Sequence, residues 1–268
     1  MADDDIILKV RDLKVEGFSD EKWNPIIKGV DLTLRRGEVL GLIGESGAGK
    51  STLGLAAMGF VRDGCRITGG SAEFDGIDLV TATPGQKRAL WGTRLTYVAQ
   101  SAAASFNPAH RLIEQTVGAT VRDGIRSSKE AHSEARQLYD ALMLPDPDNI
   151  GDRYPHQVSG GQLQRVMTAM AMSPHPSLIV FDEPTTALDV TTQVEVLLSM
   201  RKAVEESNTA AIYITHDLAV VAQMADRIKV MRFGEEVEEA PTRQMLTAPT
   251  QDYTKSLWSV RSLSKPEE

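Results

Sequence analysis

The chain has 268 residues, 41% of them hydrophobic, enough for one large α/β domain with a small insertion and a substantial core. Its net charge of −8 argues against a protein whose main task is binding nucleic acid. The single cysteine, Cys65, excludes a disulfide framework or a paired-cysteine metal site. No stretch approaches about 18 consecutive apolar residues and the start is acidic, so we expect an intracellular protein without a membrane span.

The sequence pattern up to about Phe74 predicts strands joined by turns. Apolar residues occupy every second position in two runs, at Ile6, Leu8 and Val10 and at Val30, Leu32 and Leu34. This period is typical of half-buried strands, so the pattern predicts an antiparallel β segment at the start of the chain.

A glycine-rich segment follows the apolar run at residues 39–43 and precedes a predicted helix. It has the pattern G-x-x-x-x-G-K-S, formed by Gly44, Glu45, Ser46, Gly47, Ala48, Gly49, Lys50 and Ser51. Between a strand and a helix, such a loop points backbone N–H groups at phosphates. Lys50 would reach the β- and γ-phosphates, Ser51 would ligate Mg²⁺, and we include Thr52 in the nucleotide site.

In residues 108–165 the sequence pattern becomes typical of helices. The apolar face recurs at helical spacing through Ala131, Ala135, Leu138 and Leu142. The segment that follows at residues 145–149 has two prolines and reads as a loop. We therefore expect an inserted helical layer.

A second glycine motif precedes the helical run at residues 163–172 and consists of Ser159, Gly160, Gly161 and Gln162. Its open N–H groups at a helix N-terminus predict a second phosphate site. One nucleotide cannot easily use both sites in the same chain, so the motif would close over ATP held by a partner. The alternative is a helix start that is merely capped by Ser159.

Strands at residues 177–181, 211–215 and 227–231, with a helix at 190–205, predict a parallel sheet. The candidate catalytic residues follow the carboxyl ends of these strands, which is where parallel α/β sheets bind their ligands. Asp182 would hold the metal and Glu183 would act as general base for the attacking water. His216 would reach the γ-phosphate, and Gln100, after the strand at 95–99, would ligate Mg²⁺ or orient water.

In this order the motifs resemble the nucleotide-binding subunit of ATP-binding cassette (ABC) transporters, from about Leu13 to Trp258. By this resemblance, residues 44–51 correspond to Walker A, Gln100 to the Q-loop and residues 158–162 to the signature. Asp182 corresponds to the end of Walker B and Glu183 to the catalytic glutamate. Asp189 corresponds to the end of the D-loop and His216 to the switch histidine. It implies an ATPase that forms a head-to-tail dimer around two ATP molecules with Mg²⁺ and drives membrane subunits.

Flanking segments resemble the dipeptide/oligopeptide/nickel importer subfamily, including residues 154–157 (YPHQ) and 253–257 (YTKSL). That subfamily implies a second ATPase subunit, the same or different, two permeases, an extracytoplasmic substrate-binding protein, and a place on the cytoplasmic face of the bacterial inner membrane. No nucleic-acid partner is expected, and peptides are the leading cargo, with nickel, opines, glutathione or sugar-like solutes as alternatives.

Three features depart from the family pattern. Val158 replaces the leucine that is usual in the signature, a small apolar exchange that should leave the phosphate contact intact. Gly17 stands where an aromatic residue commonly stacks on adenine, which leaves Phe18 or Trp23 as substitutes. Phe18 is assigned this role, and the alternatives are that Trp23 stacks or that neither ring does. The sequence also lacks a cysteine-bearing C-terminal extension, so an iron–sulfur cluster is not expected, and the chain is a short member or half of a tandem ATPase.

The expected fold is therefore α/β, a P-loop NTPase (RecA-like) core with an N-terminal antiparallel β subdomain and an inserted α-helical subdomain. We expect one domain, with the core and β subdomain at about 1–100 and 166–245, the insert at about 101–165, and a tail at 246–268. Two other functions remain as alternatives. The acidic charge disfavours a soluble ABC ATPase acting outside transport, and the presence of Glu183 disfavours a non-hydrolysing regulatory module.

Overall fold

The computed structural model describes residues 5–185 and 190–262. The D-loop residues 187–189, and with them the predicted contact of Asp189, lie outside the described residues. The chain divides into two compact units, one made of residues 1–83 and 212–268 and the other of residues 84–211. The second unit contains the helical segment together with the strands and helices that flank it in sequence.

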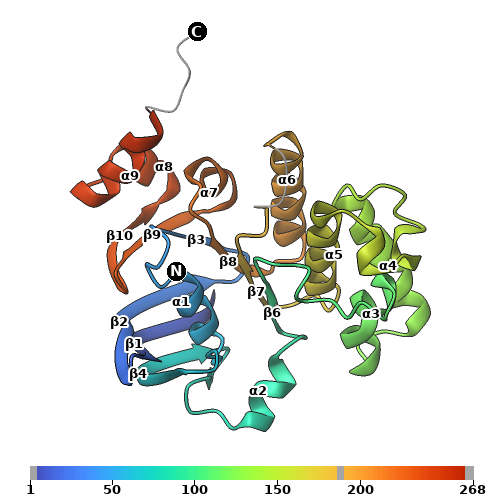
Figure 1. Ribbon diagram of the computed structural model, residues 1–268, viewed down its shortest axis with the longest axis horizontal. Helices are drawn as coiled ribbons and strands as arrows, with labels where there is room; N and C mark the ends of the chain where they lie inside the picture. Colours follow the sequence, from blue (N-terminus) through green and yellow to red (C-terminus); the bar gives the residue numbers. More distant parts are fainter. Residues whose placement is uncertain (1–4, 186–189, 263–268) are drawn as a thin grey trace. The chain divides into compact units, whose positions relative to one another are not determined.

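The first unit contains the antiparallel sheet expected at the start of the chain (Figure 1). Its order is β2-β1-β4-β5, with β1 (Ile6–Ser19), β2 (Lys22–Arg35), β4 (Cys65–Phe74) and β5 (Ile77–Asp78). Leu8 pairs with Leu34 and Val10 with Leu32, and all four side chains are buried. The alternating pattern is therefore confirmed, because the same face of both strands enters the core.

The first unit also holds β3 (Val39–Ile43), which is buried throughout and lies parallel to β9 (Arg227–Arg232). The hairpin strand β10 (Glu235–Pro241) is antiparallel to β9. Strand β8 (Ala210–Ile214) crosses the boundary of the units, and the N–H of Thr215 just beyond it donates to Leu42 of β3 at 3.2 Å. The helices of this unit are α1 (Lys50–Ala57), α7 (Leu218–Met224), α8 (Thr242–Thr247) and α9 (Asp252–Ser262).

The second unit carries β6 (Leu95–Val98) parallel to β7 (Leu178–Asp182), the latter followed by α6 (Val190–Glu206). The short helix α2 (Pro84–Leu90) precedes β6. Strand β7 is buried along its whole length, as expected for a strand covered on both faces. Its last residue is Asp182, so the predicted metal ligand stands at the carboxyl end of a buried parallel strand.

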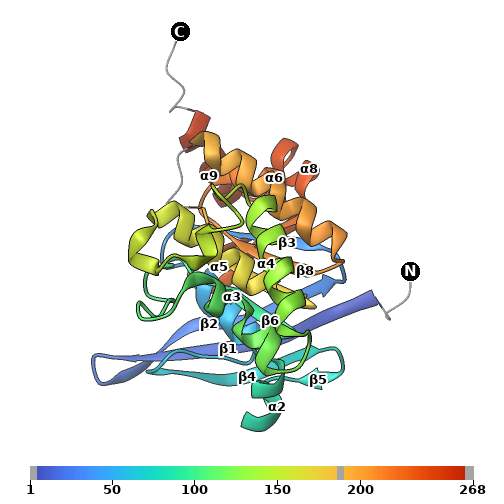
Figure 2. The same cartoon turned by 90° about the vertical axis from the view of Figure 1, so that its right-hand side faces the viewer.

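The helical layer of the second unit consists of α3 (Leu112–Arg122), α4 (Ser128–Ala141) and α5 (Gly160–Met172), with the 3₁₀ turns η2 (Ile150–Asp152) and η3 (Pro155–Gln157). The three helices pack together, and both views show them as one group (Figure 2). Ala131 and Ala135 are fully buried on the predicted apolar face of α4. Tyr139, which that pattern omitted, is buried too, and its hydroxyl lies 2.6 Å from that of Thr116.

Helix α4 begins with a capping box, since the Ser127 hydroxyl accepts the N–H of Glu130 and the Glu130 carboxylate accepts the N–H of Ser127. Over the described residues, no helix is both long and apolar enough to span a bilayer.

Candidate nucleotide site

The phosphate-binding loop begins where the buried strand β3 ends and finishes at the first turn of α1. Two of its positions require glycine. Gly44 has a φ of 149°, and a Cβ there would lie 2.2 Å from the carbonyl oxygen of Met231. Gly49, the N-cap of α1, has a φ of 94°, and a Cβ there would lie 2.7 Å from Ile27 Cδ1. The surrounding first unit therefore fixes the path of the loop.

Lys50 is nearly buried, with 7% of its surface exposed. Its ammonium donates to the carbonyl oxygens of Gly44 and Glu45 at 2.8 and 2.9 Å. A buried cation needs such partners, because desolvation without them is costly. The lysine is thus held over its own loop, with Ser51 and Thr52 half-buried beside it on α1.

His216 lies in the same unit and shares a pocket with this loop. The pocket has a volume of about 330 Å³ and is lined by Ile43, Gly44, Glu45, His216, Leu218, Ser256 and Leu257. The structure therefore brings the predicted switch histidine beside the start of Walker A. The last two lining residues belong to α9, a helix in the segment to which the sequence analysis assigned no part in the nucleotide site.

The second unit assembles the predicted acidic residues and Gln100. Asp182, with 4% of its surface exposed, accepts a hydrogen bond of 2.6 Å from the Tyr97 hydroxyl. Glu183 follows it with a φ of 51°, a left-handed conformation that is uncommon outside glycine. The Gln100 amide donates to the Glu183 carboxylate at 3.0 Å. These contacts orient both carboxylates at the end of β7.

Tyr97 was missed by the sequence analysis, although it lies in the strand that leads to Gln100. No local sequence pattern pointed to this role, because it depends on the pairing of the two strands: Tyr97 stands beside Val180, two residues before Asp182. The Tyr97 side chain is half-buried, and a buried tyrosine hydroxyl usually finds a hydrogen-bond partner, which here is Asp182.

The signature motif forms the start of α5, which begins at Gly160 rather than near residue 163. Ser159 caps the helix, since its hydroxyl accepts the Gln162 N–H at 3.2 Å while the Gln162 side chain accepts the Ser159 N–H at 3.0 Å. Helical glycines weaken the sequence signal for a helix, which explains the late predicted start. A Cβ at Gly160 would meet no atom within 4 Å, so this end of the helix is open.

The aromatic residues proposed for adenine stacking lie together at the tip of the β1–β2 hairpin. The rings of Phe18 and Trp23 are 5.3 Å apart and tilted by 57°. Phe18 is 54% exposed and Trp23 39% exposed. The Arg66 guanidinium lies 3.9 Å from the Trp23 ring centre and also pairs with Glu16 at 2.8 Å. One face of Trp23 is therefore occupied, which leaves Phe18 as the more open stacking surface.

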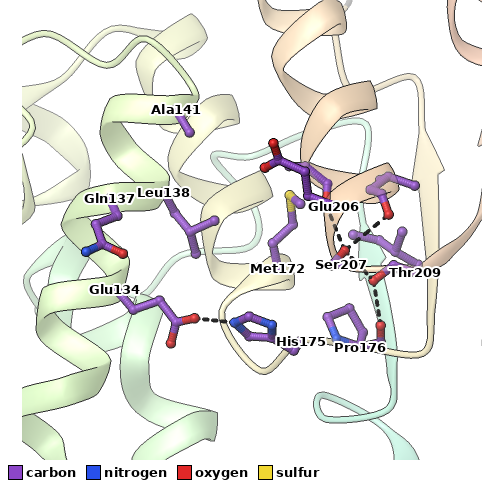
Figure 3. A pocket seen from close by; sticks show the side chains of 13 residues that line it. Glu134, Gln137, Leu138, Ala141, Met172, His175, Pro176, Glu206, Ser207 and Thr209 are labelled. Atoms are coloured by element: carbon purple, nitrogen blue, oxygen red, sulfur yellow. Dashed lines mark hydrogen bonds and ion pairs between the residues drawn. The ribbon is translucent and has the colours of Figure 1, made fainter. Parts of the chain in front are cut away.

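A separate pocket of about 300 Å³ lies in the second unit between α4, the turn after α5 and the turn after α6 (Figure 3). Two of its polar groups pair with neighbours: Glu134 with His175, and the Thr209 hydroxyl with the Pro176 carbonyl oxygen at 2.8 Å. The described residues that line it include none of the predicted site residues, so we assign it no part in nucleotide binding.

The class of protein follows from comparison with solved structures. The chain is similar to the ATP-binding cassette MJ0796, whose dimeric structure was solved in a post-hydrolysis state bound to ADP and Pi. The TM-score is 0.79 and the sequences are 25% identical, and the match covers 88% of this chain and 99% of that one. A second dimeric structure of MJ0796, described as a bacterial ABC transporter cassette, also gives a TM-score of 0.79, with 26% identity. The fold is thus a P-loop ATPase cassette, as predicted.

Sequence comparison gives the family. The ABC transporter family pattern matches residues 27–186. The chain is 36% identical to a probable peptide ABC transporter ATP-binding protein, y4tR, of Sinorhizobium fredii, over 94% of this chain and 76% of that protein. It is 38% identical to the dipeptide transport ATP-binding protein DppD of Haemophilus influenzae, over 96% and 77%. It is 37% identical to the glutathione import ATP-binding protein GsiA of Salmonella typhimurium, over 94% and 41%.

The chain therefore belongs to the ABC transporter family, as one of its ATP-binding subunits. It binds and hydrolyses ATP with Mg²⁺ as the partner ion, which confirms the reaction and the cofactors expected from the motifs.

Proposed function

We propose that this chain powers the import of a small solute, with di- or oligopeptides as the leading cargo. The relatives at 36–38% identity that support this proposal are named for peptide, dipeptide or glutathione transport. A passive regulatory module is disfavoured because Glu183, the proposed base, is present and oriented by Gln100. That hydrogen bond, next to the buried Asp182, is the observation that carries the hydrolytic part of the proposal.

Each predicted site residue then has one task. The loop at residues 44–51 and Thr52 cradle the phosphates through backbone N–H groups, and Lys50 turns its ammonium from loop carbonyls toward the β- and γ-phosphates. Glu183 takes the proton from the attacking water, while His216 contacts the γ-phosphate. Reactions of this kind depend mainly on positioning and charge stabilisation.

The proposed Mg²⁺ ligands suit the ion, because a hydroxyl, an amide and a carboxylate supply the oxygen atoms that Mg²⁺ prefers. Ser51, Gln100 and Asp182 would hold it, and a bound ion would supply positive charge against the negative phosphates. The Tyr97 hydroxyl fixes one carboxylate oxygen of Asp182. Gln100 donates through its nitrogen to Glu183, and its amide oxygen is the atom suited to the metal.

We further propose that two such subunits pair head to tail, so that Ser159, Gly160, Gly161 and Gln162 of one chain close over ATP held by the other. Two observations support this: the glycine-rich start of α5 is open, and the solved relatives named above are dimers. Asp189, outside the described residues, keeps its proposed place at the same interface. The partner is a second copy or a related ATPase.

The remaining partners are two membrane permeases and an extracytoplasmic substrate-binding protein, which place the chain at the cytoplasmic face of a bacterial inner membrane. The likeness to ATP-binding proteins named for dipeptide transport and glutathione import supports this choice of partners. The proposal is tested by reconstituting the chain in lipid with the permeases encoded beside it. Loaded binding protein should stimulate ATP hydrolysis severalfold. Hydrolysis that no neighbouring permease pair stimulates would favour a soluble ATPase working outside transport.

A further inference from the structure

Helix α9 is fixed to the first unit at its first turn. The Glu238 carboxylate on β10 accepts the backbone N–H of Thr250 and that of Gln251 at 2.7 and 3.0 Å, and the Thr250 hydroxyl at 2.8 Å. The helix packs against β10, and Thr254 on its inner side is fully buried. Strand β10 of the β9–β10 hairpin therefore sets where α9 starts (Figure 1).

Tyr253 lies in that first turn and reaches the phosphate-binding loop. Its hydroxyl accepts the backbone N–H of Glu45 at 3.4 Å. The Arg232 guanidinium lies 4.4 Å from the Tyr253 ring centre and 5.0 Å from that of Phe233, so the ring is held from the end of β9. Burial raises the pKa of the Tyr253 hydroxyl above its usual range, so the group stays neutral under ordinary conditions.

One turn further along α9, Ser256 and Leu257 line the pocket that also contains Gly44, Glu45 and His216. The β9–β10 turn also contacts the loop, since the Gly234 N–H donates to the Ala48 carbonyl oxygen at 3.1 Å. The start and the middle of Walker A are thus supported by two separate elements.

We propose that Tyr253 is a positioning residue for ATP binding, which holds the Glu45 end of the phosphate-binding loop in place from helix α9. The side chain touches neither substrate nor reacting atoms in this role. It acts through the backbone of Glu45, the second residue of the loop whose N–H groups meet the phosphates. The inference rests on the nucleotide site proposed above, and it adds the C-terminal helix to that site.

The test replaces only the hydroxyl. In Tyr253→Phe the ring remains beside Arg232 while the Glu45 N–H loses its acceptor. A neutral hydrogen bond of this kind gives an expected rise of about two- to tenfold in the dissociation constant for trinitrophenyl-ATP with Mg²⁺, and in the KM for ATP. The kcat at saturating ATP should stay unchanged, since the reacting groups are untouched.

Tyr139→Phe is the matched control. It also removes one hydroxyl hydrogen bond, but inside the helical layer, and should lower the unfolding temperature without changing ATP affinity. A second variant, Glu238→Ala, releases the start of α9 and should weaken ATP binding in the same direction. Combined with Tyr253→Phe, it should cause no further loss, because both changes break the same connection.

Unchanged ATP affinity in Tyr253→Phe, or a loss confined to kcat, would overturn the proposal. Losses that add in the double variant would also overturn it, because Glu238 would then act by another route. The binding measurement uses the isolated chain and needs neither permease nor cargo. A failed import experiment would therefore leave this result standing, and the reverse also holds.

Discussion

At the residue scale, the carboxylate of Glu183 is the group on which turnover depends. Its backbone is held at a φ of 51° and its side chain accepts from Gln100. Glu183→Gln keeps the size and the hydrogen-bonding capacity of the side chain but removes the base. We expect ATP hydrolysis to fall by about 10²- to 10⁴-fold, with MgATP binding retained. Steady-state phosphate release and equilibrium nucleotide binding measure the two effects separately.

The control for this variant is Glu73→Gln, the same exchange at an exposed position on β4, which should leave both quantities unchanged. Hydrolysis at the wild-type rate by Glu183→Gln would remove Glu183 from the role of base. Weakened binding with unchanged turnover of bound ATP would point instead to a role in holding the nucleotide.

A second single residue, Tyr97, should affect the metal requirement of the reaction. Its hydroxyl donates to the buried Asp182 carboxylate, and hydrogen bonds to charged groups are the stronger kind. Tyr97→Phe should leave Asp182 less well oriented and raise the Mg²⁺ concentration for half-maximal hydrolysis, on the order of three- to tenfold. ATP affinity in the absence of Mg²⁺ should not change. A wild-type Mg²⁺ requirement would show that the contact does not serve the metal site.

At the scale of elements, the attachment of α9 should depend on pH through Glu238. Burial opposes ionisation of this carboxyl, but the hydrogen bonds from Thr250 and Gln251 outweigh it and lower its pKa from 4.5 to about 2. Since the pKa is lower in the folded protein, the stabilisation is present above about pH 4.5 and is lost as the pH falls toward 2. Acid should therefore loosen α9.

Hydrogen exchange of the α9 amides checks this dependence by comparing wild type and Glu238→Gln at the same pH. The variant should exchange faster at pH 7 and pH 5, and the difference should shrink as the pH approaches the folded pKa. Glu73→Gln again serves as the control. A difference that stays constant from pH 7 to pH 2.5 would mean that the ionised carboxylate of Glu238 does not hold the helix.

Elements differ in how far the sequence could predict them. Strands β1, β2, β3 and β7 follow from local alternation or from short apolar runs, and helix α4 from its apolar spacing, because each pattern repeats within a few residues. The roles of Tyr97 and Tyr253 depend on partners far along the chain: Asp182 is 85 residues from Tyr97, and Glu45 is 208 residues from Tyr253. Local patterns contain no information on such pairs, so the contribution of α9 was not predicted.

At the scale of the whole molecule, the Ser159 motif has two explanations that one substitution can separate. Ser159 caps α5 within the chain, and in the proposed dimer it also faces the phosphates of a nucleotide on the partner. Aspartate is as good an N-cap as serine, so Ser159→Asp should preserve the folded subunit. Its negative charge would, however, repel the phosphates of the partner's ATP.

We therefore expect Ser159→Asp, combined with Glu183→Gln to prevent turnover, to bind MgATP at its own loop but not to form the ATP-dependent dimer. Light scattering coupled to size-exclusion chromatography measures the dimer, and thermal unfolding checks the fold. Ser127→Asp, made together with Glu130→Gln, is the matched control, because Ser127 caps α4 through a capping box whose partner, Glu130, then carries the same neutral amide as Gln162. A Ser159→Asp chain that still dimerises with ATP would reduce the motif to a helix cap, since a carboxylate among the phosphates of a closed dimer would be strongly disfavoured.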